Sequence, residues 1–334
     1  MPVTTVYLLR HALRLAYHLD PSTGLYTSNI PFPTGLSNDP PLSARGVQQT
    51  QELAHHLTSL FTPLIQANSL VVYSSCFYRC LETLKPWVRK LESTQDISLK
   101  VRPEPGIGEW YGYSSRFTHP RPLSAVDLQS KFFPFVDTTY SPGPGIDLSP
   151  DPHGESISEL HDRLARSITH IVHQVEAEYR AAGNADQDVS LLLCFHAAPM
   201  IAAGRVLTGS VPNEWSDEDF HCFTAGLSKF VRNPSSPNSS SSSDSDSSDW
   251  RNGGICSGFT MVQDSDTSFL QGGPERGWHF SGDESFDLAH VDADGTGKRA
   301  GMGKTSGKDI YGFEDEVPQE GMGVAGEGEG GSKL

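Results

Sequence analysis

Three apolar runs in this chain each end at or near a cationic side chain. The runs are residues 6–9 before Arg10 and His11, residues 70–73 before Arg79, and residues 191–195 before His196. In an open α/β sheet, ligands bind in the crevice beyond the carboxyl ends of the strands, so residues that follow different strands meet there. Arginine binds phosphate oxygens bidentately, and imidazole acts as a nucleophile or a proton carrier. The pattern therefore predicts an anion pocket, suited to a phosphoryl group, at one edge of such a sheet.

Helix-like periodicity alternates with these runs. Ser43 can cap a helix whose apolar residues share one face, namely Val47, Ala54, Leu57 and Phe61. A second helix, from Glu155, spaces its apolar residues by three and four, namely Ile157, Leu160, Leu164, Ile168, Ile171 and Val175. A short helix is expected over residues 124–132, inside a Pro- and aromatic-rich insertion that could form a lid. The alternation predicts an α/β fold, with a doubly wound, mostly parallel sheet and helices on both faces.

Composition divides the chain unevenly. Residues 1–232 carry the strand and helix patterns, whereas residues 233–249 are almost entirely Ser, Asp, Pro and Asn and are expected to form a disordered linker. Residues 250–282 have apolar and aromatic residues spaced around turn sequences, which predicts a small C-terminal β-hairpin segment. Residues 283–334 are rich in Gly and acidic residues, and are expected to form a disordered tail.

The chain is acidic, with a formal net charge of -16. Nonspecific affinity for nucleic acid depends on the neutralisation of phosphates by Lys and Arg, so no direct nucleic-acid binding is expected. The 5 cysteines are odd in number, and they are predicted to be free thiols of a reducing compartment. The sequence opens without a signal-peptide pattern, and its apolar runs are too short for a bilayer, so an intracellular location without membrane contact is expected.

Five short motifs follow one another in a recognisable order. They are residues 9–12 (Leu-Arg-His-Ala), 40–49 around Ser43, 74–83 around Arg79, 153–156 with Arg163, and 195–198 around His196. This ordered set resembles the signatures of the histidine phosphatase superfamily, which has the phosphoglycerate mutase-like fold, over roughly the first two-thirds of the chain. The resemblance implies that His11 accepts the phosphoryl group. It also implies that Arg10, Arg79 and His196 bind the equatorial oxygens of that group.

The chemistry of phosphoryl transfer supports these roles. The reaction needs an in-line nucleophile and compensation of the charge on the oxygens, and it needs no metal ion when enough cations are in place. We therefore expect neither a metal nor another cofactor. The resemblance makes Glu109 the proton donor to the leaving oxygen, and aromatic neighbours would favour the protonated form of this side chain. Arg14 matches the branch of the family with a second arginine after the first motif, and is assigned to substrate anion binding.

Two positions depart from the family pattern. Ala12 stands where the family has a glycine, close to the phosphate, and Ala16 stands where the branch with Arg14 often has Asp or Asn. Both changes point to reduced activity, so three functions stay open. The first is a phosphatase that acts on a phosphomonoester or a phosphopeptide. The second is a catalytically weak or inactive scaffold, and the third is a small-molecule phosphomutase.

Three further residues are assigned no chemical role. Arg163 is predicted to form a salt bridge with Glu155. His170 and His173 lie one helical turn apart and could bind a metal ion, but a third ligand is not evident in the sequence. We therefore expect these two histidines to belong to a solvated helix face.

A narrower resemblance concerns biological context. Residues 77–83, 106–111, 130–134, 196–198 and 267–280 are similar to the histidine-phosphatase-containing subunits of fungal TFIIIC, an RNA polymerase III transcription factor. In that group the C-terminal region contributes β-structure to a dimer with a larger subunit. The resemblance therefore implies a protein partner for residues 250–282 and a location in the nucleus, the cytoplasm or both. The alternative is that this segment folds back on the main domain.

Overall fold

A six-stranded sheet lies at the centre of the molecule. The computed structural model describes residues 3–234 and 249–281. The strands, in their order across the sheet, are β5 (Arg102–Pro103), β4 (Leu70–Ser74), β6 (Val189–Phe195), β1 (Val3–Arg10), β7 (Leu227–Arg232) and β8 (Phe259–Asp266). Neighbouring strands from β5 to β1 are parallel, and β7 runs antiparallel to both β1 and β8. The prediction of a doubly wound, mostly parallel sheet is confirmed.

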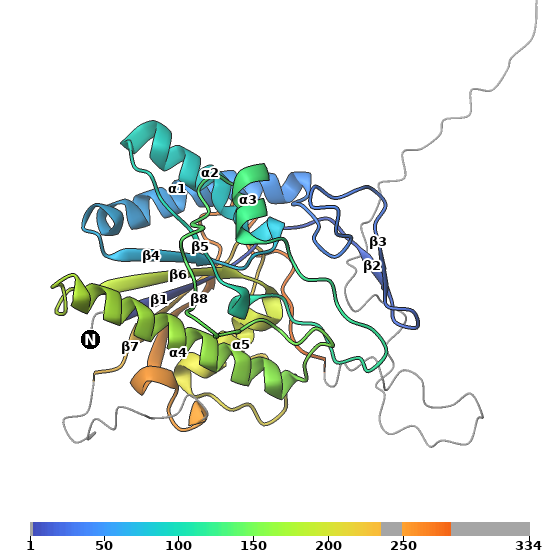
Figure 1. Ribbon diagram of the computed structural model, residues 1–334. Coiled ribbons are helices and arrows are strands. Elements are labelled where there is room, and N and C mark those ends of the chain that lie inside the picture. Colours follow the sequence, from blue (N-terminus) through green and yellow to red (C-terminus); the bar gives the residue numbers. More distant parts are fainter. Residues whose placement is uncertain (1–2, 235–248, 282–334) are drawn as a thin grey trace, which may run out of the picture.

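Helices cover both faces of this sheet, as Figure 1 shows. One layer holds α1 (Ala44–Gln66) and α2 (Tyr78–Gln95), and the other holds α4 (Ile157–Ala181) and α5 (Ala197–Thr208). Each layer covers its own apolar cluster, because successive residues of a strand point to opposite faces of the sheet. On β1, for example, Leu8 belongs to the cluster under α4 and α5, and Leu9 belongs to the cluster under α1 and α2.

Helix α1 begins where the sequence predicts. The Ser43 hydroxyl accepts a hydrogen bond from the backbone N–H of Gly46 at 3.1 Å. Leu57 and Phe61 are fully buried, but Val47 is 44% exposed. Val47 follows the predicted helical face, but it is not buried there. The reason is its place at the start of the helix, where it lines an open groove between α1 and α2 instead of lying over the sheet.

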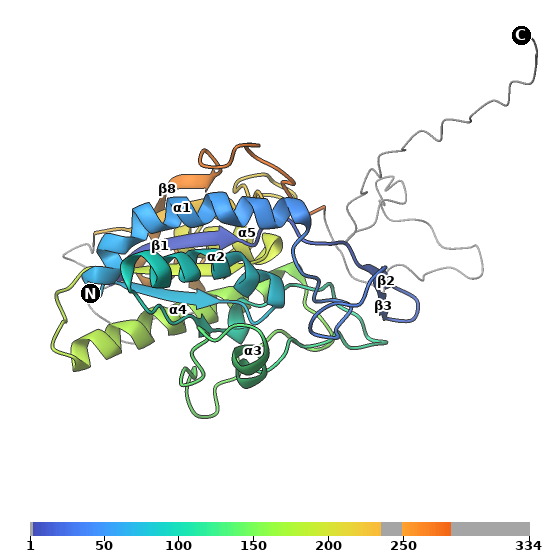
Figure 2. The same cartoon turned by 90° about the horizontal axis from the view of Figure 1, so that it is seen from above.

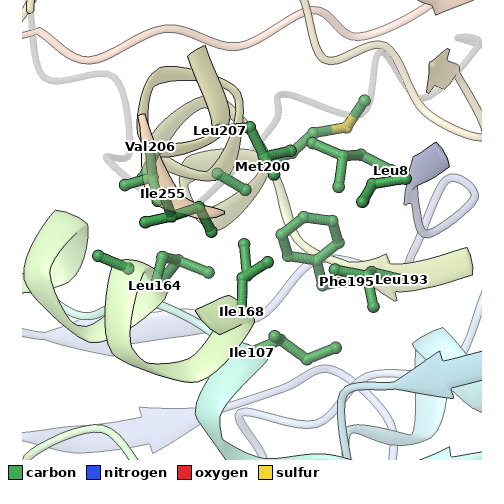
Figure 3. Packing of buried hydrophobic residues seen from close by; sticks show 14 of the residues in the cluster. Leu8, Ile107, Leu164, Ile168, Leu193, Phe195, Met200, Val206, Leu207 and Ile255 are labelled. Carbon is green, nitrogen blue, oxygen red and sulfur yellow. The ribbon is translucent and has the colours of Figure 1, made fainter. Parts of the chain in front are cut away.

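Helix α4 buries all six of its predicted apolar positions. Ser156 and Glu159 form a capping box at its first turn, in which each side chain bonds to the backbone N–H of the other residue. Figure 3 shows Leu164 and Ile168 of α4 in one apolar cluster with Phe195 of β6. This cluster fixes α4 and α5 against the sheet.

The insertion between α2 and α4 begins at the β5 edge of the sheet, and its loops continue beyond the carboxyl ends of the parallel strands (Figure 1). It contains β5, the 3-10 turn η1 (Pro105–Ile107) and α3 (Ala125–Lys131), which confirms the predicted short helix. The loop that follows β1 carries a second, small sheet of β2 (His18–Asp20) and β3 (Leu25–Thr27). The hydroxyl of Tyr26 lies 2.6 Å from Nδ1 of His119 in the insertion. The loop after β1 and the insertion therefore pack against each other.

Residues 249–281 fold back on the main domain. Strand β8 extends the sheet by pairing with β7 at its edge (Figure 2), so the predicted hairpin is formed with a strand of the central sheet. Trp250, Phe280 and Ile255 of the 3-10 turn η3 (Ile255–Ser257) are buried in the cluster with α4 and α5. A separate two-stranded hairpin could not bury these side chains, and the edge of a large sheet can.

Some predictions concern parts of the chain that lie outside the described residues. These are the disordered linker, of which only the ends are described, and the disordered tail at 283–334. Across residues 3–234 and 249–281, no helix combines the length and the apolar character needed to cross a membrane.

Candidate active site

His11 follows the last residue of β1 and is 3% exposed. Its Nδ1 lies 2.7 Å from the backbone carbonyl oxygen of Ala12. A carbonyl oxygen can only accept, so Nδ1 carries the proton and donates, which leaves Nε2 unprotonated in the neutral ring. Burial, followed by the charges of Arg79 and Arg10, lowers the pKa of His11 well below its usual value. Both observations favour a neutral imidazole with an unprotonated Nε2.

His196 is the first residue after β6 and caps α5, and its side chain is fully buried. Its ring centroid lies 5.4 Å from that of His11. Nε2 of His196 is 2.9 Å from the Ser75 hydroxyl, and Nδ1 is 3.2 Å from a carboxylate oxygen of Glu109. Burial, followed by the charge of Arg79, lowers the pKa of His196 well below its usual value. A neutral ring fits both contacts, because it accepts from the hydroxyl and donates to the carboxylate.

Arg79 lies in the first turn of α2 and is fully buried. Its Nη2 donates to Oε2 of Glu109 at 2.8 Å, and its Nη1 lies 3.5 Å from Oδ1 of Asp39. Asp39 also accepts from the backbone N–H of Tyr78 at 2.9 Å. Burial raises the pKa of Asp39 to about 7, although the charge of Arg79 opposes this shift. Asp39 therefore fixes the start of α2 and one side of the Arg79 guanidinium, a role that the sequence analysis missed.

Glu109 follows η1 in the insertion, and its side chain is 15% exposed. Its Oε2 faces both Arg79 and His196, while its Oε1 accepts from the backbone N–H of Trp110 at 3.1 Å. The expectation of aromatic surroundings is thus incomplete, because a guanidinium and an imidazole are the nearest partners of this carboxylate. Arg163 supports the turn before Glu109, since it donates to the Gly106 carbonyl at 2.7 Å. Arg163 also forms the predicted salt bridge, with Nε at 2.8 Å from a carboxylate oxygen of Glu155.

Arg10 and Arg14 complete the cationic surroundings. Arg10 is 3% exposed, and its Nη1 donates to the backbone carbonyls of Cys222 and Arg276. Burial lowers the pKa of Arg10 and of Arg14, and the charge of Arg79 acts on both in the same direction. The guanidinium of Arg14 lies over the ring of Tyr17, 4.7 Å from its centroid. The sequence-predicted site residues are therefore all brought to one end of the sheet.

Ala12 fits the site without entering it. The residue is fully buried, and its side chain belongs to the apolar cluster under α1 and α2. Its backbone N–H donates to the hydroxyl of Thr83 at 3.0 Å. The extra methyl group, relative to glycine, therefore packs in the protein core.

Three site residues could also be considered as metal ligands. The ligand atoms of His11, Glu109 and His196 all lie within 4.8 Å of one another. The surroundings fit a cation poorly, because Arg79 is paired with the same carboxylate and its charge bears on both imidazoles. The charge of Arg14 also bears on both rings. Buried guanidinium groups stabilise an oxyanion and repel a metal ion, so this donor set suits a phosphate.

A cavity of about 350 Å³ adjoins the site. Glu109 lies in its wall, together with aromatic and proline residues of the insertion such as Tyr111, Pro122 and Tyr140. The larger groove between α1 and α2, about 530 Å³, is lined by none of the site residues. The smaller cavity therefore offers the space through which a bound group could reach Glu109, in agreement with the idea that the insertion covers the site.

Fold and site together define a doubly wound α/β protein with a buried histidine and arginine pocket at the carboxyl ends of its strands. A family model, the histidine phosphatase superfamily (branch 1), matches residues 6–244. The chain belongs to the histidine phosphatase superfamily.

Several known proteins are similar to this chain. Over 215 residues it is 36% identical to the transcription factor tau 55 kDa subunit of Saccharomyces cerevisiae, a match that covers 63% of this chain and 42% of the relative. It is 29% identical over 208 residues to human ubiquitin-associated and SH3 domain-containing protein A, covering 59% and 28%. The match thus spans less than half of either relative. The yeast relative is a subunit of a transcription factor, which bears out the narrower resemblance to a fungal transcription factor subunit.

Solved structures are similar at lower identity. The crystal structure of ecdysone phosphate phosphatase from Bombyx mori, in complex with tungstate, is 20% identical with a TM-score of 0.45. This match covers 71% of the present chain and 96% of the other.

Proposed function

We propose that this protein is a metal-independent phosphatase that works through a phosphohistidine on His11. Its substrate would be a phosphomonoester or a phosphopeptide. The observation that carries the proposal is the state of the His11 ring, whose Nδ1–H is held by the Ala12 carbonyl so that Nε2 is a free nucleophile. Membership of the histidine phosphatase superfamily supports the same assignment.

The proposed reaction has two steps. Nε2 of His11 attacks the phosphorus atom, so an N–P bond forms while the P–O bond to the leaving group breaks, and the leaving oxygen takes the proton of the Glu109 carboxyl group. Water then attacks the phosphohistidine and gives a proton to Glu109. Inorganic phosphate leaves, and His11 is restored. Arg10, Arg79 and His196 stabilise the charge on the equatorial oxygens in both steps, and Arg14 would bind a further anionic part of the substrate.

The contacts of Glu109 fit this cycle. Its carboxylate is bound by Arg79 at 2.8 Å. A phosphate that accepts from Arg79 would take over this donor and release Glu109 to act as an acid. Its 15% exposed side chain and its place in the cavity wall support this role, because a substrate that entered through the cavity would meet Glu109 beside Arg79.

We also propose that the protein acts as a subunit of a TFIIIC-like transcription factor in the nucleus, with a larger subunit as partner. The similarity to the yeast tau 55 kDa subunit supports this context. The same similarity also supports a second candidate function, in which the phosphatase fold is mainly a scaffold and the protein assembles with its partner through residues 250–282. The division into a main domain, a linker at 233–249 and a tail at 283–334 belongs to the same proposal.

Hydrolysis by the full-length protein tests the catalytic proposal. The substrates are p-nitrophenyl phosphate and a phosphotyrosine peptide, assayed with EDTA from about pH 5 to 8, which brackets the ordinary imidazole pKa of about 6.5. We expect turnover that resists EDTA and falls at least about 10³-fold in His11→Ala. His173→Ala, which removes an exposed histidine on α4, should behave as the wild type. Absence of turnover in well-folded wild-type protein would favour the scaffold function.

A further inference from the structure

The C-terminal segment reaches the first predicted phosphate ligand. Nη1 of Arg10 donates to the backbone carbonyl of Arg276 at 2.6 Å, and also to that of Cys222. Among the described residues, Nε of Arg10 is buried and has no hydrogen-bond partner. Two carbonyls thus orient one end of the guanidinium, while a buried N–H group of the same plane is left for an oxyanion.

Glu275 ties this segment to the loops around the site. Its carboxylate pairs with Arg45 at the start of α1 and accepts from Nε2 of Gln49 at 3.4 Å. The other end of the Gln49 amide accepts from the backbone N–H of Leu13 at 2.9 Å, two residues after the nucleophile. The backbone carbonyl of Glu275 accepts from the N–H of Thr224 at 3.1 Å. Residues 275 and 276 are therefore held by α1 and by Thr224, and Gln49 of α1 links them to the loop that follows His11.

The segment also reaches the opposite side of the site. The rings of Trp278 and Phe280 lie 6.4 and 5.5 Å from the ring of Trp110, the residue directly after Glu109. The Cys222 thiol donates to the Trp278 carbonyl at 3.2 Å. Residues 275–280 therefore contact Arg10 at one end of the segment and Trp110 at the other end.

We infer that residues 275–280 are positioning residues for phosphoryl transfer, with the Arg276 carbonyl setting the orientation of the Arg10 guanidinium. The inference rests on the proposed function, because it concerns the phosphate ligand of that reaction. Arginine binds an oxyanion through a planar fork of N–H groups, so its affinity depends on the plane in which the fork is held. The C-terminal segment thus forms part of the active site as well as the edge of the sheet.

The backbone of Arg276 provides a specific test. Its φ angle is 52°, in the left-handed region. Glycine adopts this angle freely, whereas proline is fixed near −65°, which would move the carbonyl away from Arg10. Arg276→Gly also removes the side chain, so the comparison of Arg276→Pro with Arg276→Gly isolates the backbone. The Tm and the circular dichroism spectrum report whether each variant is folded.

Two measurements are made on both full-length variants: kcat/KM for p-nitrophenyl phosphate and the affinity for inorganic phosphate by titration calorimetry. We expect both quantities to be about 10-fold to 100-fold lower in Arg276→Pro than in Arg276→Gly, because both variants lack the side chain and differ only in the backbone. Equal values for the two variants would overturn the inference. If Arg276→Pro does not fold, Glu275→Gln takes its place, with the exposed Glu92→Gln on α2 as control, and equal phosphate affinity in this pair would likewise contradict the inference.

The phosphate affinity measured by calorimetry distinguishes a failure of the positioning role from a failure of the proposed phosphatase function. Absence of turnover in the wild type would refute the proposed function. Loss of phosphate affinity in Arg276→Pro alone would still support the positioning role. Normal turnover in the wild type with unchanged phosphate affinity in both variants would refute only the positioning role.

Discussion

Two buried regions of the molecule differ in the side chains that form them. One is the charged pocket at the strand ends. The other is the aromatic cluster in which residues 250–280 pack around His161, which is called the seam below. In the pocket, Arg79 and His196 are fully buried and contact charged or polar groups. In the seam, the rings of Trp250 and Phe280 pack around His161. Buried charge costs free energy even when it is paired, whereas buried aromatic area stabilises the fold. The seam therefore offsets part of the free-energy cost of the pocket, and the C-terminal segment stabilises the domain.

The largest expected change in stability is at Phe280, which is 1% exposed. Its ring contacts Trp110, Trp278 and His161, so Phe280→Ala leaves a cavity at the centre of the seam. We expect a loss of about 3 to 5 kcal/mol in the free energy of unfolding, measured by urea denaturation of the full-length protein. As a control, Val262→Ala removes an apolar side chain of the same segment that is 56% exposed, and should cost less than about 0.5 kcal/mol.

The relative cost of these two substitutions measures how much the C-terminal segment stabilises the domain. If Phe280→Ala were no more destabilising than Val262→Ala, the segment would contribute little to the stability of the domain. A truncated protein of residues 1–232 would then be the simpler unit to study, as the sequence alone suggests. If the prediction holds, such a truncation exposes the seam.

A smaller effect is expected at His161, and it depends on pH. Burial lowers the pKa of His161 to about 4, and the charges of Arg205 and Arg251 act in the same direction while Asp162 opposes them. The unfolded chain, with a pKa near 6.5, binds a proton that the folded state excludes. The stability is therefore unaffected above about pH 6.5 and falls as the pH drops from about 6.5 to 4.

Replacement by Phe removes this titration and keeps an aromatic ring. The free energy of unfolding of His161→Phe, relative to the wild type, should rise by up to about 3 kcal/mol as the pH falls from about 7 to 4. His173→Phe, at an exposed position of α4, is the matched control and should leave the pH dependence unchanged. A difference between His161→Phe and the wild type that is constant with pH would contradict the account of the seam.

Much of the pocket could be predicted because its residues follow strands. Arg10, His11 and His196 stand directly at the ends of apolar runs, and strand ends converge in a parallel sheet. Arg79 comes five residues after β4, yet the first turn of α2 returns it to the same place. The fold class and two of the helices followed from periodicity, which reports the face that a residue presents to the core.

The contacts between distant segments could not be predicted. Asp39 and Ser75 have spatial partners in Arg79 and His196, and nothing in their spacing along the chain encodes these pairs. The contact from Arg10 to residue 276 uses a backbone carbonyl, which every residue has, so it leaves no mark in the sequence. Val47 follows the helical period correctly, but the period does not say where the covering sheet ends.

The most direct test of the central claim is detection of the phosphohistidine. Full-length protein is mixed with a phosphotyrosine peptide, quenched within the first turnovers at alkaline pH and digested, and the phosphorylated residue is located by mass spectrometry. The account predicts one phosphoryl group on His11, absent from His11→Ala and lost on treatment with acid. Steady turnover with His11 unmodified, or with the phosphoryl group on a different residue, would contradict it.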